Sequence, residues 1–151
     1  MTRFLLVFSV VSILGCAPLG PVPGGALRGE THAGRSPDWN SLAAVHTIQL
    51  ESRPSDPYSV NTWLGVVDGV LYVPSSLIYG PDVPTERGWV RHVQEDARVR
   101  LRIEGTVYEL RAVRIEDAAT AERVRSALLE KYGVAPDEHT AQAWIFRMDA
   151  R

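Results

Sequence analysis

The sequence is poor in the residues that most enzyme motifs require. It holds one cysteine, Cys16, so a disulfide within the chain is excluded. It contains no Cys-x-x-Cys, no HExxH, no P-loop and no Gly-x-Ser-x-Gly. His46, His92 and His139 are scattered along the chain. The carboxylates form no pair that would indicate a hydrolase. Catalysis is not excluded, because some oxidoreductases leave the chemistry to a cofactor and need no acid or base from the protein.

Lysine is nearly absent, since 15 of the 16 basic residues are arginine. The formal net charge is −2 and the pI is about 6.1. A nucleic-acid-binding domain needs a basic face, so we expect no nucleic-acid partner. The hydrophobic content of 45% and the charged content of 23% are typical of a globular protein.

The longest apolar run, residues 4–14, is too short for a permanent membrane helix, which needs roughly 20 residues. It follows one basic residue, Arg3, and a small residue precedes Cys16, as in an export signal. The segment Ile-Leu-Gly-Cys at 13–16 resembles the bacterial lipobox. That resemblance implies that Cys16 is lipidated and becomes the first residue of an exported protein. The alternative is an ordinary secretion signal with an incidental cysteine.

The absence of a second cysteine favours lipidation, because an unpaired thiol is unusual in an exported protein. The lipobox resemblance implies anchoring to membrane lipid in the cell envelope. The resemblance to Gram-negative lipoproteins implies the outer membrane if the cell is Gram-negative, because Ala17 rather than aspartate follows the cysteine. Residues 17–38 are rich in proline and glycine without hydrophobic periodicity. We therefore predict a signal peptide at 1–15, a lipidated cysteine with a disordered tether at 16–38, and a folded domain at 39–151.

The domain is predicted to be mainly β-sheet with short helices, of the α+β class. Asp68-Gly69 stands between two β-rich runs and predicts a type I′ hairpin. The segment 98–104 alternates strictly, with valine, leucine and isoleucine on one face and arginines on the other. We interpret the arginine face as solvated rather than as a phosphate-binding stripe. The strands are expected at 45–50, 60–67, 70–73, 98–104, 107–115 and 143–148.

The remaining segments predict helices and a bend. Asp117 is a plausible N-cap for a helix that continues to Tyr132 and ends at Gly133. Residues 74–88 read as a loop, and 89–96 as a short helix with Trp89 inward. The apolar phase of the 107–115 strand shifts near Val113, which predicts a β-bulge. A β-rich chain of this order suits a small barrel, which removes exposed strand edges.

Three stretches carry a family resemblance: VVDGVLYVPSS, GWVRHVQEDARVRLRIEGTVYELRAVRIED and AERVRSALLEKYG. Over residues 45–149 the chain resembles the split β-barrel superfamily of flavin-binding oxidoreductases. It is most similar to the deazaflavin-dependent nitroreductase and pyridoxamine-phosphate-oxidase-like branches. The resemblance implies a small split β-barrel with a cofactor cleft, FMN or deazaflavin as cofactor, and a homodimer.

The resemblance also implies a site. Ser75 and Ser76 would contact a phosphate, and Trp89, Arg91 and His92 would lie beside it. Hydroxyls and a guanidinium suit phosphate, and tryptophan can provide an aromatic wall. The structural alternatives are a core position for Trp89, a solvated helix charge at Arg91 and a surface position for His92. Metal ligands are not expected.

Two functions remain open at this point. The first is a membrane-anchored envelope lipoprotein whose barrel is a binding or structural module without its cofactor. Export favours it, since flavins are made in the cytoplasm, and so do the acids of the loops ESRPSDPYS and PDVPTER. The second is a flavin- or deazaflavin-dependent reductase of a small acceptor such as a quinone or nitro compound. The intact barrel pattern and the pair Gly88-Trp89 favour this alternative.

Overall fold

The structure is a computed structural model that describes residues 17–20, 22–33, 37–78 and 83–151. The expected signal peptide and Cys16 lie outside the described residues, so their roles remain predictions. Within the described ranges, no helix has the length and apolar character needed to cross a membrane.

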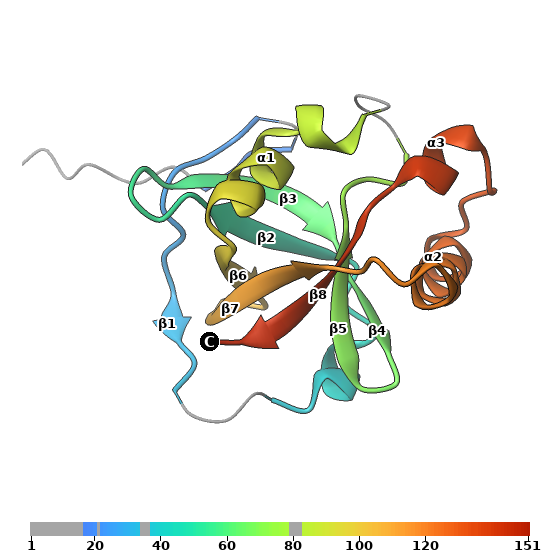
Figure 1. Cartoon of the computed structure of the whole chain (residues 1–151). Helices are drawn as coiled ribbons and strands as arrows, with labels where there is room; N and C mark the ends of the chain where they lie inside the picture. The colour runs from blue at the N-terminus through green and yellow to red at the C-terminus, as the bar shows by residue number, and fades with distance from the viewer. Residues whose placement is uncertain (1–16, 21, 34–36, 79–82) are drawn as a thin grey trace, which may run out of the picture.

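One curled antiparallel sheet forms the body of the molecule (Figure 1). Its strand order is β3-β2-β6-β7-β8-β5-β4. The curl brings β3 near β5 without pairing them, and this seam between β3 and β5 is where the barrel is split. The strand bounds are β2 Thr47–Ser52, β3 Tyr58–Trp63, β4 Gly65–Val67, β5 Val70–Pro74, β6 Arg98–Ile103, β7 Thr106–Arg114 and β8 Ile145–Ala150.

The helices are short and lie around the sheet. Two of them, η2 and α1, stand close to the seam, and α2 packs on β4. Their bounds are η1 Trp39–Leu42, η2 Pro84–Glu86, α1 Gly88–Glu95, α2 Ala118–Tyr132 and α3 Glu138–Gln142. The predicted caps of α2 are confirmed, since the Asp117 carboxylate accepts the Thr120 N–H at 2.7 Å and Gly133 ends the helix with φ of 63°.

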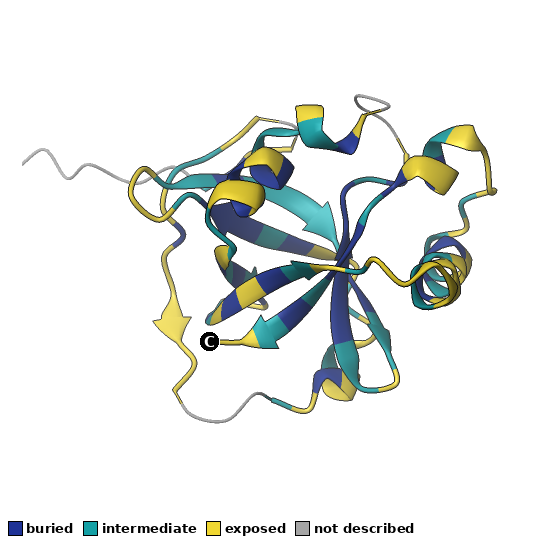
Figure 2. Cartoon of the chain, in the orientation of Figure 1, coloured by how far each residue is buried: buried dark blue, intermediate teal, exposed yellow. Residues whose placement is uncertain are grey.

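The sequence patterns place the hairpin and the core correctly. Asp68 and Gly69 both have positive φ, 52° and 73°, as a type I′ turn requires. Val99, Leu101 and Ile103 are at most 1% exposed, and the arginines between them face outward. Buried and exposed residues also alternate over 109–112 of β7, whereas β5 is buried continuously from Leu71 to Pro74 (Figure 2). The predicted fold class and this strand are therefore confirmed.

The predicted bulge in β7 is wrong. The pairing of β7 is unbroken with β6 over residues 106–111 and with β8 over residues 110–114. Tyr108, Leu110 and Ala112 pack on the barrel core. Val107 and Ile115 are apolar although they face away from this core, because other elements cover them. The short strand β1, Glu30–Thr31, pairs with β7 at Val107, and Ile115 packs against α2. The shift of the apolar pattern from one face of β7 to the other therefore shows which face is covered by other elements, and it does not indicate a bulge.

The chain before residue 34 also differs from the expected tether. We call residues 17–20 and 22–33 the strap, because they lie along the barrel. Gly24 exchanges two backbone hydrogen bonds with Ser59, at 2.8 and 2.9 Å. Leu27 is 3% exposed, and strand β1, Glu30–Thr31, pairs in parallel with β7. Such a segment lacks the apolar content to fold alone, but the sheet supplies partners for its backbone.

Candidate functional site

A cleft of about 600 Å³ opens at the seam. Its walls are β3, the residues that follow β5, and the start of α1, with Gly20 of the strap at one side. This volume is within the range of small-molecule sites, roughly 300–1,000 Å³. With Thr47 at the start of β2, the cleft therefore gathers residues from five separate parts of the chain.

Trp63 forms the aromatic wall of the cleft. Its ring stacks on Tyr132 of α2, with centroids 4.0 Å apart and planes 3° apart. The Tyr132 hydroxyl lies 2.6 Å from the His46 carbonyl and accepts the Leu64 N–H at 3.1 Å. Burial raises the pKa of Tyr132 to about 12, so this hydroxyl stays protonated at physiological pH. The end of α2 thus fixes Trp63 at the end of β3.

Ser75 and Ser76 both line the cleft, as the resemblance implies, but their surroundings differ. The buried Ser75 is tied to the start of β8, since its N–H donates to the Trp144 carbonyl at 2.8 Å and its Oγ accepts the Trp144 N–H at 3.1 Å. Ser76 is half-buried, and its Oγ accepts the Ile78 N–H at 3.5 Å. Of the two hydroxyls, that of Ser76 is the better placed for a ligand.

Trp89 borders the cleft from the core. It is 4% exposed and its ring lies 5.0 Å from that of Phe146, so it supports the cleft floor rather than offering a free face. Gly88 precedes it at the wall, where a Cβ would come within 3.0 Å of the Tyr58 hydroxyl. Arg87, at the N-cap position, makes no side-chain capping bond to α1. The first-turn amides of α1 therefore stand at the cleft wall without a side-chain cap.

Arg87 and Glu86 are the charged residues that line the cleft within the described chain. They are adjacent in sequence and opposite in charge. The cleft therefore has a polar end that is close to neutral, with one guanidinium able to bind an anionic group.

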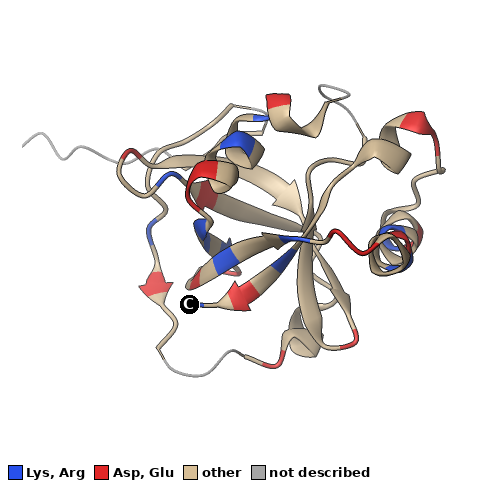
Figure 3. Cartoon of the chain, in the orientation of Figure 1, with Lys and Arg blue, Asp and Glu red and all other residues tan. Residues whose placement is uncertain are grey.

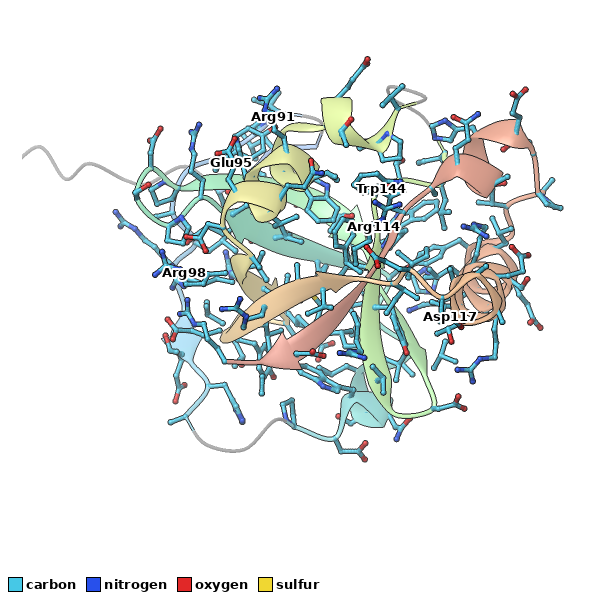
Figure 4. All side chains as sticks on the ribbon, viewed as in Figure 1. Arg91, Glu95, Arg98, Arg114, Asp117 and Trp144 are labelled. Carbon is cyan, nitrogen blue, oxygen red and sulfur yellow. The ribbon has the colours of Figure 1, made fainter. Side chains whose placement is uncertain are left out.

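Arg91 and His92 do not line the cleft. Arg91 is exposed on the outer side of α1, close to Glu95 (Figure 4). His92 is 7% exposed and faces β2, where its Nδ1 lies 3.0 Å from Ser52 Oγ. Its ring meets Tyr58 edge-on at 5.1 Å. Burial, followed by the charges of Arg53 and Arg91, lowers the pKa of His92, so the buried ring is neutral at pH 7.

The structure therefore brings three of the five predicted cofactor-binding residues to one cleft. Sequence reasoning missed Trp63, which the two-residue period of β3 places on the same face as Asn61. An aromatic residue in the polar phase of a strand was the available signal. Arg87 stands out in the sequence as one of two bases in otherwise acidic loops.

A second cavity of about 320 Å³ lies beside β6. Arginines line it, but each has an acidic partner: Arg98 with Asp96, Arg100 with Glu51 and Arg151 with Glu109. The two signs of charge alternate along this part of the sheet (Figure 3). No group of three or more metal-ligating side chains is found in the part of the chain that the structure describes.

Comparison with known proteins gives the fold. No family model matches the sequence, and no curated protein matches it significantly. A conserved hypothetical protein from Mycobacterium tuberculosis, Rv2991, superposes with a TM-score of 0.56 at 18% identity, over 74% of this chain and 77% of its own. The domain is a split β-barrel.

Two further split-barrel neighbours have been solved. A FAD-binding protein from Mesorhizobium loti superposes with a TM-score of 0.52 at 18% identity, over 76% of this chain and 87% of its own. An F420 reductase superposes with a TM-score of 0.50 at 15% identity, over 78% of this chain and 96% of its own. These identities are low, so the likeness concerns the fold, and a split barrel hosts more than one function.

Proposed function

We propose that this chain is a lipid-anchored envelope protein whose split barrel is a binding module for a small molecule with a planar ring. The observation that carries the binding role is the cleft at the seam, with Trp63 held as its wall by Tyr132. Aromatic faces bind flat ligands through offset stacking and large contact area. The stacked pair is fixed before any ligand arrives, which lowers the entropy cost of binding.

The polar end limits the charge of the ligand. Arg87 offers a fork of donors, and the Ser76 hydroxyl and the first amides of α1 can add hydrogen bonds. Glu86 lines the same cleft and repels a second negative charge. The geometry therefore favours a ring that carries a neutral or singly charged group over a dianionic phosphate.

A second candidate is a flavin- or deazaflavin-dependent reductase of a small acceptor such as a quinone or nitro compound. The split-barrel neighbours that are a FAD-binding protein and an F420 reductase favour it. The cleft has the size for such a cofactor, and when bound a flavin supplies hydride chemistry from its own ring. In this chain Trp63 would flank the ring, and Arg87 with Ser76 would hold the tail.

Titration of the full chain in detergent decides between the two candidates. Riboflavin, FMN, FAD and F420 are added separately while ligand fluorescence is followed. Riboflavin binding within about threefold of FMN supports a ring-binding module, whereas FMN or F420 binding more than about tenfold tighter than riboflavin supports the reductase. If none of the four ligands shows saturable binding, the reductase is contradicted, and a flavin ring is excluded as the ligand of the binding module.

Two variants locate the ligand. Trp63→Ala is expected to weaken ring binding by about tenfold, because it removes the stacking surface. Arg91→Ala is the matched control, since this side chain is exposed on the outer side of α1, and it should leave the affinity unchanged. Equal effects of the two substitutions would show that the ligand binds elsewhere.

The anchor is proposed from the sequence. Acyl chains contribute roughly 0.8 kcal/mol per buried CH₂, and more than one chain makes anchoring stable. Cys16→Ser should abolish incorporation of labelled fatty acid and leave the precursor uncleaved by the lipoprotein peptidase. Ser12→Ala, four residues earlier, should be processed like the wild type. Unchanged labelling of the Cys16→Ser protein rules out this anchor.

A further inference from the structure

Four large hydrophobic side chains are exposed in the described residues: Leu19, Val22, Ile78 and Val83, with exposed fractions of 75, 60, 48 and 49%. One of the four lines the cleft, and the other three lie within three residues of a lining residue in the sequence. Ile78 lines it, Leu19 and Val22 form a β-bridge on either side of the lining residue Gly20, and Val83 precedes η2, whose Glu86 lines it. We call these four side chains the apolar rim.

From the apolar rim we infer a membrane-docking surface that places the mouth of the cleft against the lipid headgroups. The inference rests on the proposed anchor at Cys16 for its orientation. The strap attaches to the barrel almost at once after that residue, since Asn61 Nδ2 donates to the Gly20 carbonyl at 3.1 Å. Four residues span at most about 14 Å when fully extended. A lipid at Cys16 would therefore bring the rim within reach of the bilayer surface.

The composition of the rim favours lipid over a protein partner. Protein interfaces are enriched in aromatic residues and arginine, whereas the rim is aliphatic throughout. A stable protein interface needs about 800 Å² on each partner, which four side chains do not supply. Lipid contact needs no matching shape, and shallow insertion of a few aliphatic side chains beside an acyl anchor is enough. Glu86 and Arg87 at the mouth have opposite charges, so we expect docking to depend little on salt.

A fluorescent label at the rim tests the docking. In the full chain carrying Cys16→Ser, an added Val83→Cys is the only cysteine and is labelled with NBD. Ala44→Cys, which is exposed in the turn after η1 and does not line the cleft, is the matched control. The apolar segment at 4–14 brings both proteins to vesicles of equal phosphatidylcholine and phosphatidylglycerol. Brominated lipids should quench the label at position 83 at least about threefold more than the label at position 44.

A charge substitution supplies the second measurement. Ile78→Glu together with Val83→Glu should abolish lipid quenching of NBD placed at Leu19→Cys, because carboxylates keep the rim out of the headgroup layer. Ala119→Glu with Ala135→Glu adds the same charge at exposed positions away from the cleft and should leave that quenching unchanged. Circular dichroism confirms that all variants are folded.

Each result decides the proposal. Equal quenching at positions 83 and 44, or none at 83 on vesicle-bound protein, overturns it. A label at 83 that responds to protein concentration without lipid assigns the rim to a second copy of the chain and also overturns it. These assays use Cys16→Ser protein, so they do not depend on acylation, and the failure of the anchor would be seen separately in fatty-acid labelling.

Discussion

At the scale of single residues, Glu51 is a buried carboxylate that serves the fold rather than the cleft. It is 4% exposed, accepts two hydrogen bonds from Arg100 at 3.0 and 3.2 Å, and accepts the Leu27 N–H at 2.5 Å. It therefore joins β2, β6 and the strap. A buried charge retains such a position only when partners satisfy it.

Glu51→Ala is expected to lower the free energy of unfolding by about 2–4 kcal/mol, because it leaves the Arg100 charge and the Leu27 amide without their partner. Arg100 keeps some access to water, so the loss stays below that of a fully buried pair. Urea unfolding followed by circular dichroism measures it. Glu109→Ala, which removes the half-exposed partner of Arg151, should cost less than about 1 kcal/mol. Equal losses would contradict the role of Glu51.

His92 makes stability depend on pH. Its pKa is lowered by burial and then by Arg53 and Arg91, so the folded chain binds this proton less tightly than the unfolded chain. Stability is then fully present above the unfolded pKa of about 6.5 and is lost as pH falls from there toward the lowered folded pKa. His92→Gln should reduce the loss of unfolding free energy between about pH 7.5 and 5.5. An unchanged slope would contradict this assignment.

The pH window is chosen to isolate this residue. The carboxyl pKa values that hydrogen bonds lower, such as that of Asp96, lowered by Arg98 to about 2, act in the same direction but at lower pH. Above about pH 5.5 they are already ionised in both states, given ordinary carboxyl pKa values near 4. The difference between wild type and variant therefore reports His92.

At the scale of elements, the strap depends on one glycine. A Cβ on Gly29 would come within 2.4 Å of the Gly105 carbonyl oxygen in the β6–β7 turn. Gly29→Ala should therefore displace β1 from β7 and cost about 1–3 kcal/mol of stability. The exposed Arg28 next to it should then be cleaved faster by trypsin. Gly25→Ala, whose Cβ would meet nothing within 4 Å, is the control and should match the wild type in both assays.

Local sequence patterns predicted the individual strands, turns and helices, but they did not predict which elements pack against one another. The alternation of 98–103, the Asp68-Gly69 turn and the capped helix after Asp117 each follow from neighbours in sequence. The strap could not be placed, because its order comes from backbone partners on β3 and β7. Strand β7 was misread for the same reason, since the residues that cover Val107 are remote in sequence.

The candidate site divides in the same way. The end of β5 and the start of α1 face the cleft, and they bring Ser75, Ser76 and Trp89 to it. These three positions were predicted from the sequence because they directly follow a strand or begin a helix. His92 does not reach the cleft because α1 packs on β2 at this residue, where His92 Nδ1 lies 3.0 Å from Ser52 Oγ. Trp63 depends on α2 docking at the end of β3, a contact between segments nearly 70 residues apart.

At the scale of the whole molecule, the cleft and the apolar rim occupy the seam, while the arginine-rich face lies on β6 and β8. Four arginines of that face form ion pairs: Arg98 with Asp96, Arg100 with Glu51, Arg151 with Glu109 and Arg147 with Asp149. Arg102 donates a hydrogen bond to the neutral side chain of Gln49. With a formal net charge of −2 on the chain, long-range attraction for polyanions is weak. The expectation that nucleic acid is not a partner was drawn from the net charge, and it stays a prediction.

Retention on heparin tests whether pairing, and not the number of arginines, decides polyanion binding. The wild type should pass through at low salt, because carboxylates neutralise four of the arginines on this face. A triple variant, Asp96→Asn with Asp149→Asn and Glu109→Gln, changes the formal net charge from −2 to +1 and frees three arginines on one face. It should be retained. Glu116→Gln with Glu130→Gln and Glu138→Gln reaches the same charge at exposed positions away from that face and should not be. Retention of the wild type, or of both triple variants alike, would contradict the prediction.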